Sequence, residues 1–337
     1  AQAMVANGKG ILAIDESHST CKKRFDSLGI ECTEETRRAY RGLLISAPGV
    51  EEYISGMILF DETLRQKTDD GTPFPEVLRG KGIIPGIKVD MGAKPLALHE
   101  GESVTEGLDG LRERLAEYKS HGAQFAKWRA VIAIGKNMPS RACIMANAHA
   151  LARYAALVQE AEMVPMVEPE ILIDGAHTIE RCYEVTADVL HTLFEELAQQ
   201  GVSFEGTILK VSMVLSGKDN PNQADEKTVA EMTLKCLKEN VPAALPGIVF
   251  LSGGQSDEKA TAHLNEMNKM GKTPEWSFPW SLSFSYGRAI QNAALQIWAK
   301  NMSDIPRAQQ AVVKRSHLNS LAALGKYEPA LETEMAA

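Results

Sequence analysis

Short apolar runs alternate along the chain with longer amphipathic segments. Eight runs are typical of strands, and most are bounded by glycine, proline or polar residues. They lie at 10–15, 56–60, 83–90, 125–129, 164–170, 206–214, 247–251 and 282–286. Apolar residues recur at three- and four-residue spacing in segments 108–119, 142–161, 179–199 and 227–240, which predicts helices there.

Strands that alternate with helices favour a parallel sheet, and eight repeats favour a closed (β/α)8 TIM barrel. The alternative is a doubly wound open sheet. A dinucleotide-binding form of it is disfavoured because no Gly-x-Gly-x-x-Gly follows the first strand-like run. No low-complexity linker divides the sequence. We therefore expect one domain over residues 1–337, with a short N-terminal extension and a C-terminal tail from about residue 328.

Charged residues interrupt five of the strand-like runs near their carboxyl ends. Side chains alternate between the two faces of a strand, and helices cover the outer face of a barrel strand. The charged set must therefore point into the barrel, at the end where barrel enzymes build their active sites. The alternative is a group of structural ion pairs that fills the barrel. The set consists of Asp15, Lys88, Asp90, Lys127, Arg129, Glu168, Glu170 and Lys210.

Lys210 stands inside the apolar run 207–214. A lysine is rarely buried without a partner, so either its amine reaches water or the protein needs an amine there for chemistry. A desolvated lysine can act as a nucleophile and form a Schiff base with a carbonyl. That reaction requires the neutral amine, which burial and neighbouring cations both favour. We interpret the inward-pointing set as an active site.

Two loop regions predict anion sites. One comprises Ser252, Gly253 and Gly254 after the seventh run, together with Ser285, Gly287 and Arg288 at the end of the eighth. Barrels commonly bind phosphate there through backbone N–H groups and a helix N-terminus, and the arginine would add a charge-assisted contact. A second site would combine Lys88 with Ser17, Thr20, Lys23 and Arg24. The basic run 22–24 is equally consistent with a solvated helix face.

Composition narrows the classes of partner. The net charge of −8 argues against nucleic acid or an anionic membrane as the main partner, but not against a small anion in a basic pocket. No apolar run is long enough to predict a membrane span.

The five cysteines are scattered and form no CxxC, which favours a reducing compartment over a disulfide framework or a zinc module. The eight histidines are dispersed as well, so we expect them at surface or capping positions. The sequence has no initiating Met and no signal-like segment, from which we expect a processed or trimmed start.

The segments 10–17, 86–90, 125–129, 167–172, 251–256 and 284–288 together closely resemble class I (Schiff-base) fructose-1,6-bisphosphate aldolase. The resemblance extends from about residue 8 to residue 327. Several positions, such as Ile14 and the segment 209–213, look nearer to plastid and algal forms than to animal ones. The resemblance implies reversible cleavage of fructose 1,6-bisphosphate to dihydroxyacetone phosphate and glyceraldehyde 3-phosphate, with neither cofactor nor metal.

The resemblance also implies roles for individual residues. Lys210 matches the Schiff-base lysine, Glu168 the general acid/base and Glu170 the carboxylate that assists carbinolamine dehydration. Lys127 and Asp15 match the pair that contacts the substrate around its C4 hydroxyl. The ketose-phosphate (C1) site is matched by Ser252, Gly253, Gly287 and Arg288, and positions near the distal phosphate by Ser17, Thr20, Arg24 and Lys88. We add Gly254, Ser285 and Arg129 to the candidate substrate- and phosphate-binding residues.

The sequence departs from the family pattern at several points. Val211 and Ser212 follow the lysine where many relatives have Pro-Asn, which we expect to change rigidity more than chemistry. Met91 replaces a common lysine. The segment from 328 onward contains no tyrosine, whereas the family's mobile tail normally carries one associated with protonation of the enamine.

Two other functions are compatible with the resemblance. One is a broader sugar-bisphosphate aldolase that also makes sedoheptulose 1,7-bisphosphate. The other is a catalytically silent phosphate-binding scaffold, against which the intact Lys210, Glu168 and Lys127 argue. The resemblance further implies phosphorylated sugars as substrates, a homo-oligomer that is usually a tetramer, and the cytoplasm or the plastid stroma as the compartment.

Overall fold

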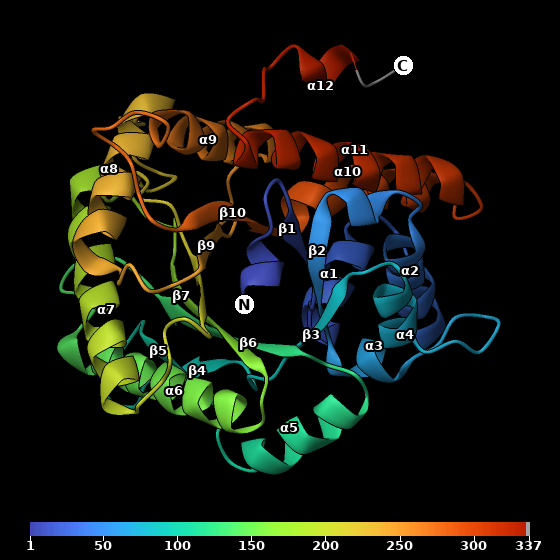
Figure 1. Cartoon of the computed structure of the whole chain (residues 1–337), viewed down its shortest axis with the longest axis horizontal. Coiled ribbons are helices and arrows are strands. Elements are labelled where there is room, and N and C mark those ends of the chain that lie inside the picture. Colours follow the sequence, from blue (N-terminus) through green and yellow to red (C-terminus); the bar gives the residue numbers. More distant parts are fainter. Residues whose placement is uncertain (335–337) are drawn as a thin grey trace.

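The computed structural model describes residues 1–334. Eight parallel strands close into a barrel, which confirms the predicted (β/α)8 fold (Figure 1). Each predicted strand is present, and its ends differ from the prediction by no more than three residues. In order around the barrel the strands are β1 (Gly10–Ile14), β2 (Ile54–Leu59), β3 (Ile84–Lys88), β6 (Phe125–Ile132), β7 (Val164–Ile171), β8 (Ile208–Val211), β9 (Gly247–Phe250) and β10 (Ser281–Tyr286).

Strand β8 is shorter than predicted for a local reason. The hydroxyl of Ser212 donates to the carbonyl of Ile171 at 2.9 Å and accepts from the N–H of Ile171 at 3.1 Å. The side chain of Ser212 thus takes both backbone groups of a residue on the neighbouring strand. Ladder pairing between β7 and β8 therefore ends early, while Ser212 stays fixed at the carboxyl end of the barrel.

Helices form the outer layer of the barrel (Figure 1). The four predicted amphipathic helices are present as α5 (Leu111–Ser120), α6 (Arg141–Glu160), α7 (Ile179–Gln199) and α8 (Glu226–Asn240). Several helices begin at a side-chain cap, such as Ser140 on α6 and Thr178 on α7, which satisfies an otherwise unpaired N–H of the first turn. The other helices are α1 (His18–Asp26), α2 (Glu34–Ser46), α3 (Asp61–Arg65), α4 (Phe74–Gly80), α9 (Asp257–Met270), α10 (Arg288–Lys300), α11 (Ile305–Ala323) and α12 (Leu331–Glu334).

Four small elements complete the described part of the chain. The 3-10 helices η1 (Gln2–Val5) and η2 (Val50–Glu52) precede β1 and β2, and β4 (Ala93–Pro95) pairs antiparallel with β5 (Ser103–Thr105). Figure 1 shows the N-terminal segment within the ring of strands. A salt bridge of 2.6 Å between Arg315 and Glu332 holds α12 against α11. Residues 335–337 of the predicted tail lie outside the described residues.

The amino end of the barrel interior is apolar. Met4 and Val5 of η1 pack there with Phe125, Met166 and Ile208. Glycine is required beside the larger side chains: a Cβ on Gly247 would lie 2.6 Å from Val5, and one on Gly86 would lie 2.1 Å from the Phe125 ring. Close packing here fills the barrel up to the level at which its charged residues begin. Among residues 1–334, no helix is long and apolar enough to cross a membrane.

Candidate active site

A cleft of about 720 Å³ opens at the carboxyl end of the barrel strands. Of the predicted site residues, all except Lys23 and Gly254 line it. Gly254 instead lines a neighbouring cavity of about 750 Å³, on the other side of the loop that follows β9. The predicted residues in the cleft are Asp15, Ser17, Thr20, Arg24, Lys88, Lys127, Arg129, Glu168, Glu170, Lys210, Ser252, Gly253, Ser285, Gly287 and Arg288.

Lys210, Glu168 and Lys127 form the centre of the cleft. Each residue is less than 5% exposed. The amine of Lys210 lies 3.1 Å from Glu168 Oε1, and the amine of Lys127 lies 3.2 Å from Glu168 Oε2. Lys127 also lies 2.6 Å from Asp15 Oδ2, so a chain of alternating charge runs from β1 through β6 and β7 to β8. Alternation along each strand explains the arrangement, because all four side chains occupy inward positions.

These neighbours keep the buried groups ionised. Burial alone would raise the pKa of Asp15, but Lys127 beside it lowers that pKa to about 2. Burial likewise opposes the charge of Glu168, yet Lys127 and Lys210 hold the pKa of its carboxyl below the usual value. The pKa of Lys127 is raised, because Asp15 and Glu168 outweigh the desolvation of its ammonium. Lys127 is therefore a fixed cation and Glu168 a carboxylate that can accept a proton.

Glu168 retains an unused acceptor. Its Oε2 atom is buried and accepts no hydrogen bond from the described residues, although Lys127 lies within ion-pair distance. A buried carboxylate oxygen without a hydrogen bond is unfavourable unless a ligand supplies a donor. A hydroxyl of a bound substrate would be such a donor.

Two further ion pairs border this centre. The guanidinium of Arg129 contacts the carboxylate of Glu170, and the amine of Lys88 lies 2.7 Å from Asp90 Oδ1. Burial disfavours the charge of Arg129, but Glu170 raises its pKa, so the pair stays ionised. Two backbone donors fix the carboxylate of Asp90: its Oδ2 accepts from the backbone N–H of Arg129, and its Oδ1 accepts from the backbone N–H of Gly92. Asp90 was predicted to point inward but was absent from the candidate site residues.

The predicted ketose-phosphate site is built from the ends of β9 and β10. Gly253 has a φ of +55°, which favours glycine, and Gly287 caps α10 without a side chain over the first helical N–H groups. The hydroxyl of Ser285 is buried and has no hydrogen-bond partner among the described residues. With Arg288 at the start of α10, these groups offer hydrogen-bond donors and a positive charge suited to a phosphate.

Gln255 stabilises the loop that carries Ser252 and Gly253. Its amide nitrogen donates to the Ser252 carbonyl at 3.1 Å, and its Oε1 accepts from His263 Nδ1 at 2.6 Å. His263 is only 5% exposed, so the prediction of a surface or capping position is wrong for this histidine. Burial and the nearby Lys259 lower the pKa of His263 to about 4.

The second predicted anion site lies around α1. Ser17 caps this helix by accepting from the Thr20 N–H at 3.4 Å, and both residues line the cleft with Arg24 and Lys88. The basic run 22–24 divides: Lys22 is exposed and pairs with Asp26, whereas Arg24 faces the cleft. Lys23 is exposed and is not among the lining residues. Lys22 and Lys23 thus lie on a solvated helix face, whereas the role of Arg24 in an anion site stays a prediction.

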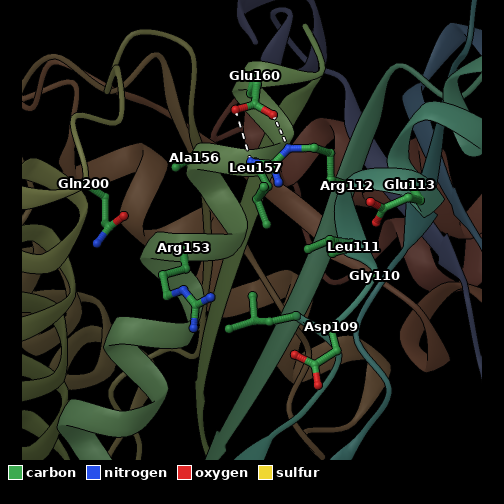
Figure 2. Close-up of a pocket in the computed structure, with 11 residues that line it drawn as sticks. Asp109, Gly110, Leu111, Arg112, Glu113, Arg153, Ala156, Leu157, Glu160 and Gln200 are labelled. Atoms are coloured by element: carbon green, nitrogen blue, oxygen red, sulfur yellow. Dashed lines mark hydrogen bonds and ion pairs between the residues drawn. The ribbon is translucent and has the colours of Figure 1, made fainter.

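A different hollow, of about 480 Å³, lies on the outer wall between α5 and α6 (Figure 2). An ion pair of 2.6 Å between Arg112 and Glu160 crosses it, and both side chains are more than half exposed. None of the predicted site residues lines this hollow. Its exposed ion pair offers neither the buried amine nor the desolvated carboxylate of the barrel cleft.

Known proteins resemble this chain over nearly its full length. The family model for fructose-bisphosphate aldolase class-I matches residues 1–337. The probable fructose-bisphosphate aldolase class 1 of Xanthomonas axonopodis pv. citri is 63% identical over 329 residues, which cover 97% of each chain. The chloroplastic fructose-bisphosphate aldolase 1 of Chlamydomonas reinhardtii is 50% identical over 100% of this chain and 88% of its own length. Overall identity is thus higher to this bacterial relative than to the chloroplastic one.

A solved structure supports the same assignment. The fructose-bisphosphate aldolase of Plasmodium falciparum aligns with a TM-score of 0.94 and 46% identity, covering 97% of this chain and 93% of that chain. With a full-length family match and relatives of this identity, the chain belongs to the class I fructose-bisphosphate aldolases, which cleave a phosphorylated sugar through a lysine Schiff base.

Proposed function

We propose that Lys210 is the amine that forms the Schiff base in this aldolase, and that Glu168 is its general acid/base. The carrying observation is the buried contact of 3.1 Å between the two side chains, in a cleft bordered by two candidate phosphate sites. Among residues 1–334, Glu168 is the only ion-pair partner of Lys210. A carboxylate at this distance can take a proton from the ammonium and so free the amine for attack.

Substrate orientation is the first task of the site. The ketose phosphate would bind Ser252, Gly253, Ser285, Gly287 and Arg288, and the distal phosphate would bind near Arg24. Held at both ends, the sugar has its carbonyl carbon directed to Lys210 and its C4 hydroxyl to Glu168. Binding energy from the two phosphates thereby orients the bond to be broken. Arg129 and Lys88 supply further positive charge along the sugar.

The covalent steps follow from the charges. The Lys210 amine adds to the ketose carbonyl, and the resulting carbinolamine loses water to give an iminium. Glu170, fixed by Arg129, is placed to assist this dehydration. The leaving water carries away the proton that Glu168 took from the ammonium, so Glu168 is again a carboxylate. Its Oε2 then takes the C4 hydroxyl proton, and the bond between C3 and C4 breaks. The electron pair moves onto the iminium to give an enamine, and glyceraldehyde 3-phosphate leaves. The enamine takes up a proton at C3, and hydrolysis of the new iminium releases dihydroxyacetone phosphate.

Lys127 and Asp15 support the cleavage step. The fixed cation of Lys127 lies beside the carboxylate that accepts the C4 proton, so it stabilises negative charge that develops there. Asp15 neutralises part of the Lys127 charge at 2.6 Å and orients its amine.

A Lys210→Met variant tests the assignment. Methionine nearly preserves the length of the side chain but has no nucleophile, so we expect cleavage of fructose 1,6-bisphosphate to fall at least about 10⁴-fold. The matched control is Lys23→Met, at an exposed lysine outside the lining of the cleft. Full activity of the Lys210 variant would overturn the proposal.

The assembly and compartment are further parts of this proposal. We propose one catalytic domain over 1–337, a homo-oligomer that by family resemblance is a tetramer, and the cytoplasm or plastid stroma as the location. Both compartments are reducing, which suits a chain whose five cysteines are unpaired. Light scattering of the purified chain measures the oligomeric state. Specificity constants for fructose and sedoheptulose bisphosphates measure the breadth of substrate use.

A further inference from the structure

Two consecutive carboxylates at the end of β1 have different partners. Asp15 pairs with Lys127 inside the barrel. Glu16 Oε1 instead accepts from Arg24 Nη1 at 2.6 Å and from Gln291 Nε2 at 2.9 Å. Glu16 therefore connects α1, which carries the distal-phosphate arginine, to α10, which begins at the ketose-phosphate site.

Buried residues fix Glu16 without help from Arg24. Arg41, which is 1% exposed, donates to the Glu16 carbonyl at 2.5 Å. Gln291, also 1% exposed, donates to the Ala13 carbonyl at 2.6 Å as well as to Glu16, and its Oε1 accepts from the Tyr40 hydroxyl at 3.2 Å. Buried side chains thus bind both the backbone carbonyl and the carboxylate of Glu16. One of them, Gln291, lies one turn of α10 beyond Gly287.

Arg24 has no comparable support of its own. Its side chain is 23% exposed, and Glu16 supplies its only ion-pair contact within residues 1–334. That contact uses one of the five N–H donors of the guanidinium and leaves the others for a ligand in the cleft. A free arginine loses rotamer freedom when it binds a phosphate, whereas an arginine already held by a carboxylate does not.

Glu16 also offsets part of the Arg24 charge, which works against binding an anion. Glu16 lines the cleft beside Arg24, but a phosphate in direct hydrogen-bonding contact with the guanidinium would lie nearer to that guanidinium than to the Glu16 carboxylate. The attraction therefore exceeds the repulsion, and the gain from ordering the side chain remains.

We propose that Glu16 is the positioning residue for Arg24 and thereby sets the preference of the enzyme for a bisphosphate over a ketose monophosphate. This inference rests on the proposed role of Arg24 at the distal phosphate. It assigns to Glu16 no part in bond making or breaking.

The test compares fructose 1,6-bisphosphate with fructose 1-phosphate, which lacks the distal phosphate. In a Glu16→Gln variant, the amide preserves shape but loses the charge that holds Arg24. We expect KM for the bisphosphate to rise about fivefold, the effect of losing one partly buried ion pair. KM for the monophosphate and kcat for both substrates should change less than about twofold. The unchanged turnover of the monophosphate also shows that the variant is folded. Glu51→Gln is the matched control, since Glu51 pairs with Lys81 at 2.9 Å away from the cleft.

An Arg24→Ala variant separates the two levels of the inference. We expect a larger rise in KM for the bisphosphate alone, and no further rise when Glu16→Gln is added. If Arg24→Ala affects both substrates equally or neither, the distal-phosphate assignment fails, and the role of Glu16 fails with it. If Arg24→Ala discriminates but Glu16→Gln lowers KM for the bisphosphate, leaves it unchanged or raises both KM values alike, the positioning role alone is overturned.

Discussion

The two ends of the barrel interior have opposite chemistry although the same strands build them. At the amino end, Phe125, Met166 and Ile208 pack in an apolar cluster. Two residues further along the same strands, Lys127, Glu168 and Lys210 form a network of buried charges. One inward step along β6, β7 and β8 therefore separates a packed core from the reactive centre.

This contrast shows how the fold accommodates an unfavourable site. Burying a charge costs free energy unless a partner of opposite sign is close, and even a well-paired set adds little net stability. The apolar end has no such cost, since burial of its side chains stabilises the fold directly. Stability and chemistry are thus assigned to different levels of one barrel, and substitutions at the two levels should affect different measurements.

Among substitutions of the carboxylates in the cleft, Glu168→Gln should give the largest effect on rate. The amide cannot take the C4 proton, so we expect kcat to fall between about 10²- and 10⁴-fold. Steady-state cleavage of fructose 1,6-bisphosphate measures it, with the exposed Glu184→Gln as control. Glu170→Gln should reduce kcat less. The opposite order would exchange the roles of the two carboxylates.

Phe125→Ala should lower stability and leave the rate nearly unchanged, because Phe125 belongs to the apolar cluster at the amino end of the barrel. Removing a fully buried ring that packs against Gly86 leaves a cavity, and we expect the free energy of unfolding to fall by about 3 to 5 kcal/mol. At a temperature where the variant is folded, kcat should stay within about twofold of the wild-type value. Urea unfolding and kinetics on the same sample measure both quantities, and Leu28→Ala is the exposed control. A collapse of kcat without loss of stability would mean that the two levels are not separate.

His263 is a buried titratable group outside the network of paired charges, and its protonation should affect stability. The ionised groups inside the barrel have counterions, whereas burial and Lys259 lower the pKa of His263 from 6.5 to about 4. Between these values the unfolded chain binds a proton that the folded chain does not. Stability is therefore retained above pH 6.5 and lost as the pH falls toward 4, by about 2 to 3 kcal/mol.

A His263→Asn variant removes this dependence. The asparagine amide can replace Nδ1 as the donor to Gln255 but does not titrate in this range. Chemical unfolding at pH 7, 5.5 and 4 should show a smaller decline for the variant than for the wild type. Equal declines would contradict the assignment of His263 as a buried neutral group.

The barrel could be predicted from the sequence because its signals are local. A period of two distinguished the outward Leu209 and Val211 from the inward Lys210, and the same alternation identified the charged set. The helix α1 gave no such signal, since only Cys21 and Phe25 of its nine residues are buried. The β4–β5 pair was missed because its strands have three residues each and one contains a proline.

Other parts of the site depend on contacts that are distant in sequence. Glu16 and Gln291 are 275 positions apart, and neither stands in a pattern that relates it to the other. The burial of His263 was missed although a signal was present: His263 lies at helical spacing from the apolar Ala260 and Met267 and so shares their buried face. For Asp90 the signal was present, because it shares the inward face with Lys88, and a search for counterions of each predicted lysine would have found it.

The central claim is that Lys210 forms the covalent intermediate, and trapping tests it most directly. The protein would be incubated with dihydroxyacetone phosphate in the presence of EDTA, reduced with borohydride and digested, and the modified peptide sequenced by mass spectrometry. Reduction of the iminium leaves a stable secondary amine, so the account predicts one triose-phosphate adduct, located on Lys210. An active sample that yields no adduct, or an adduct on Lys127 in place of Lys210, would contradict it.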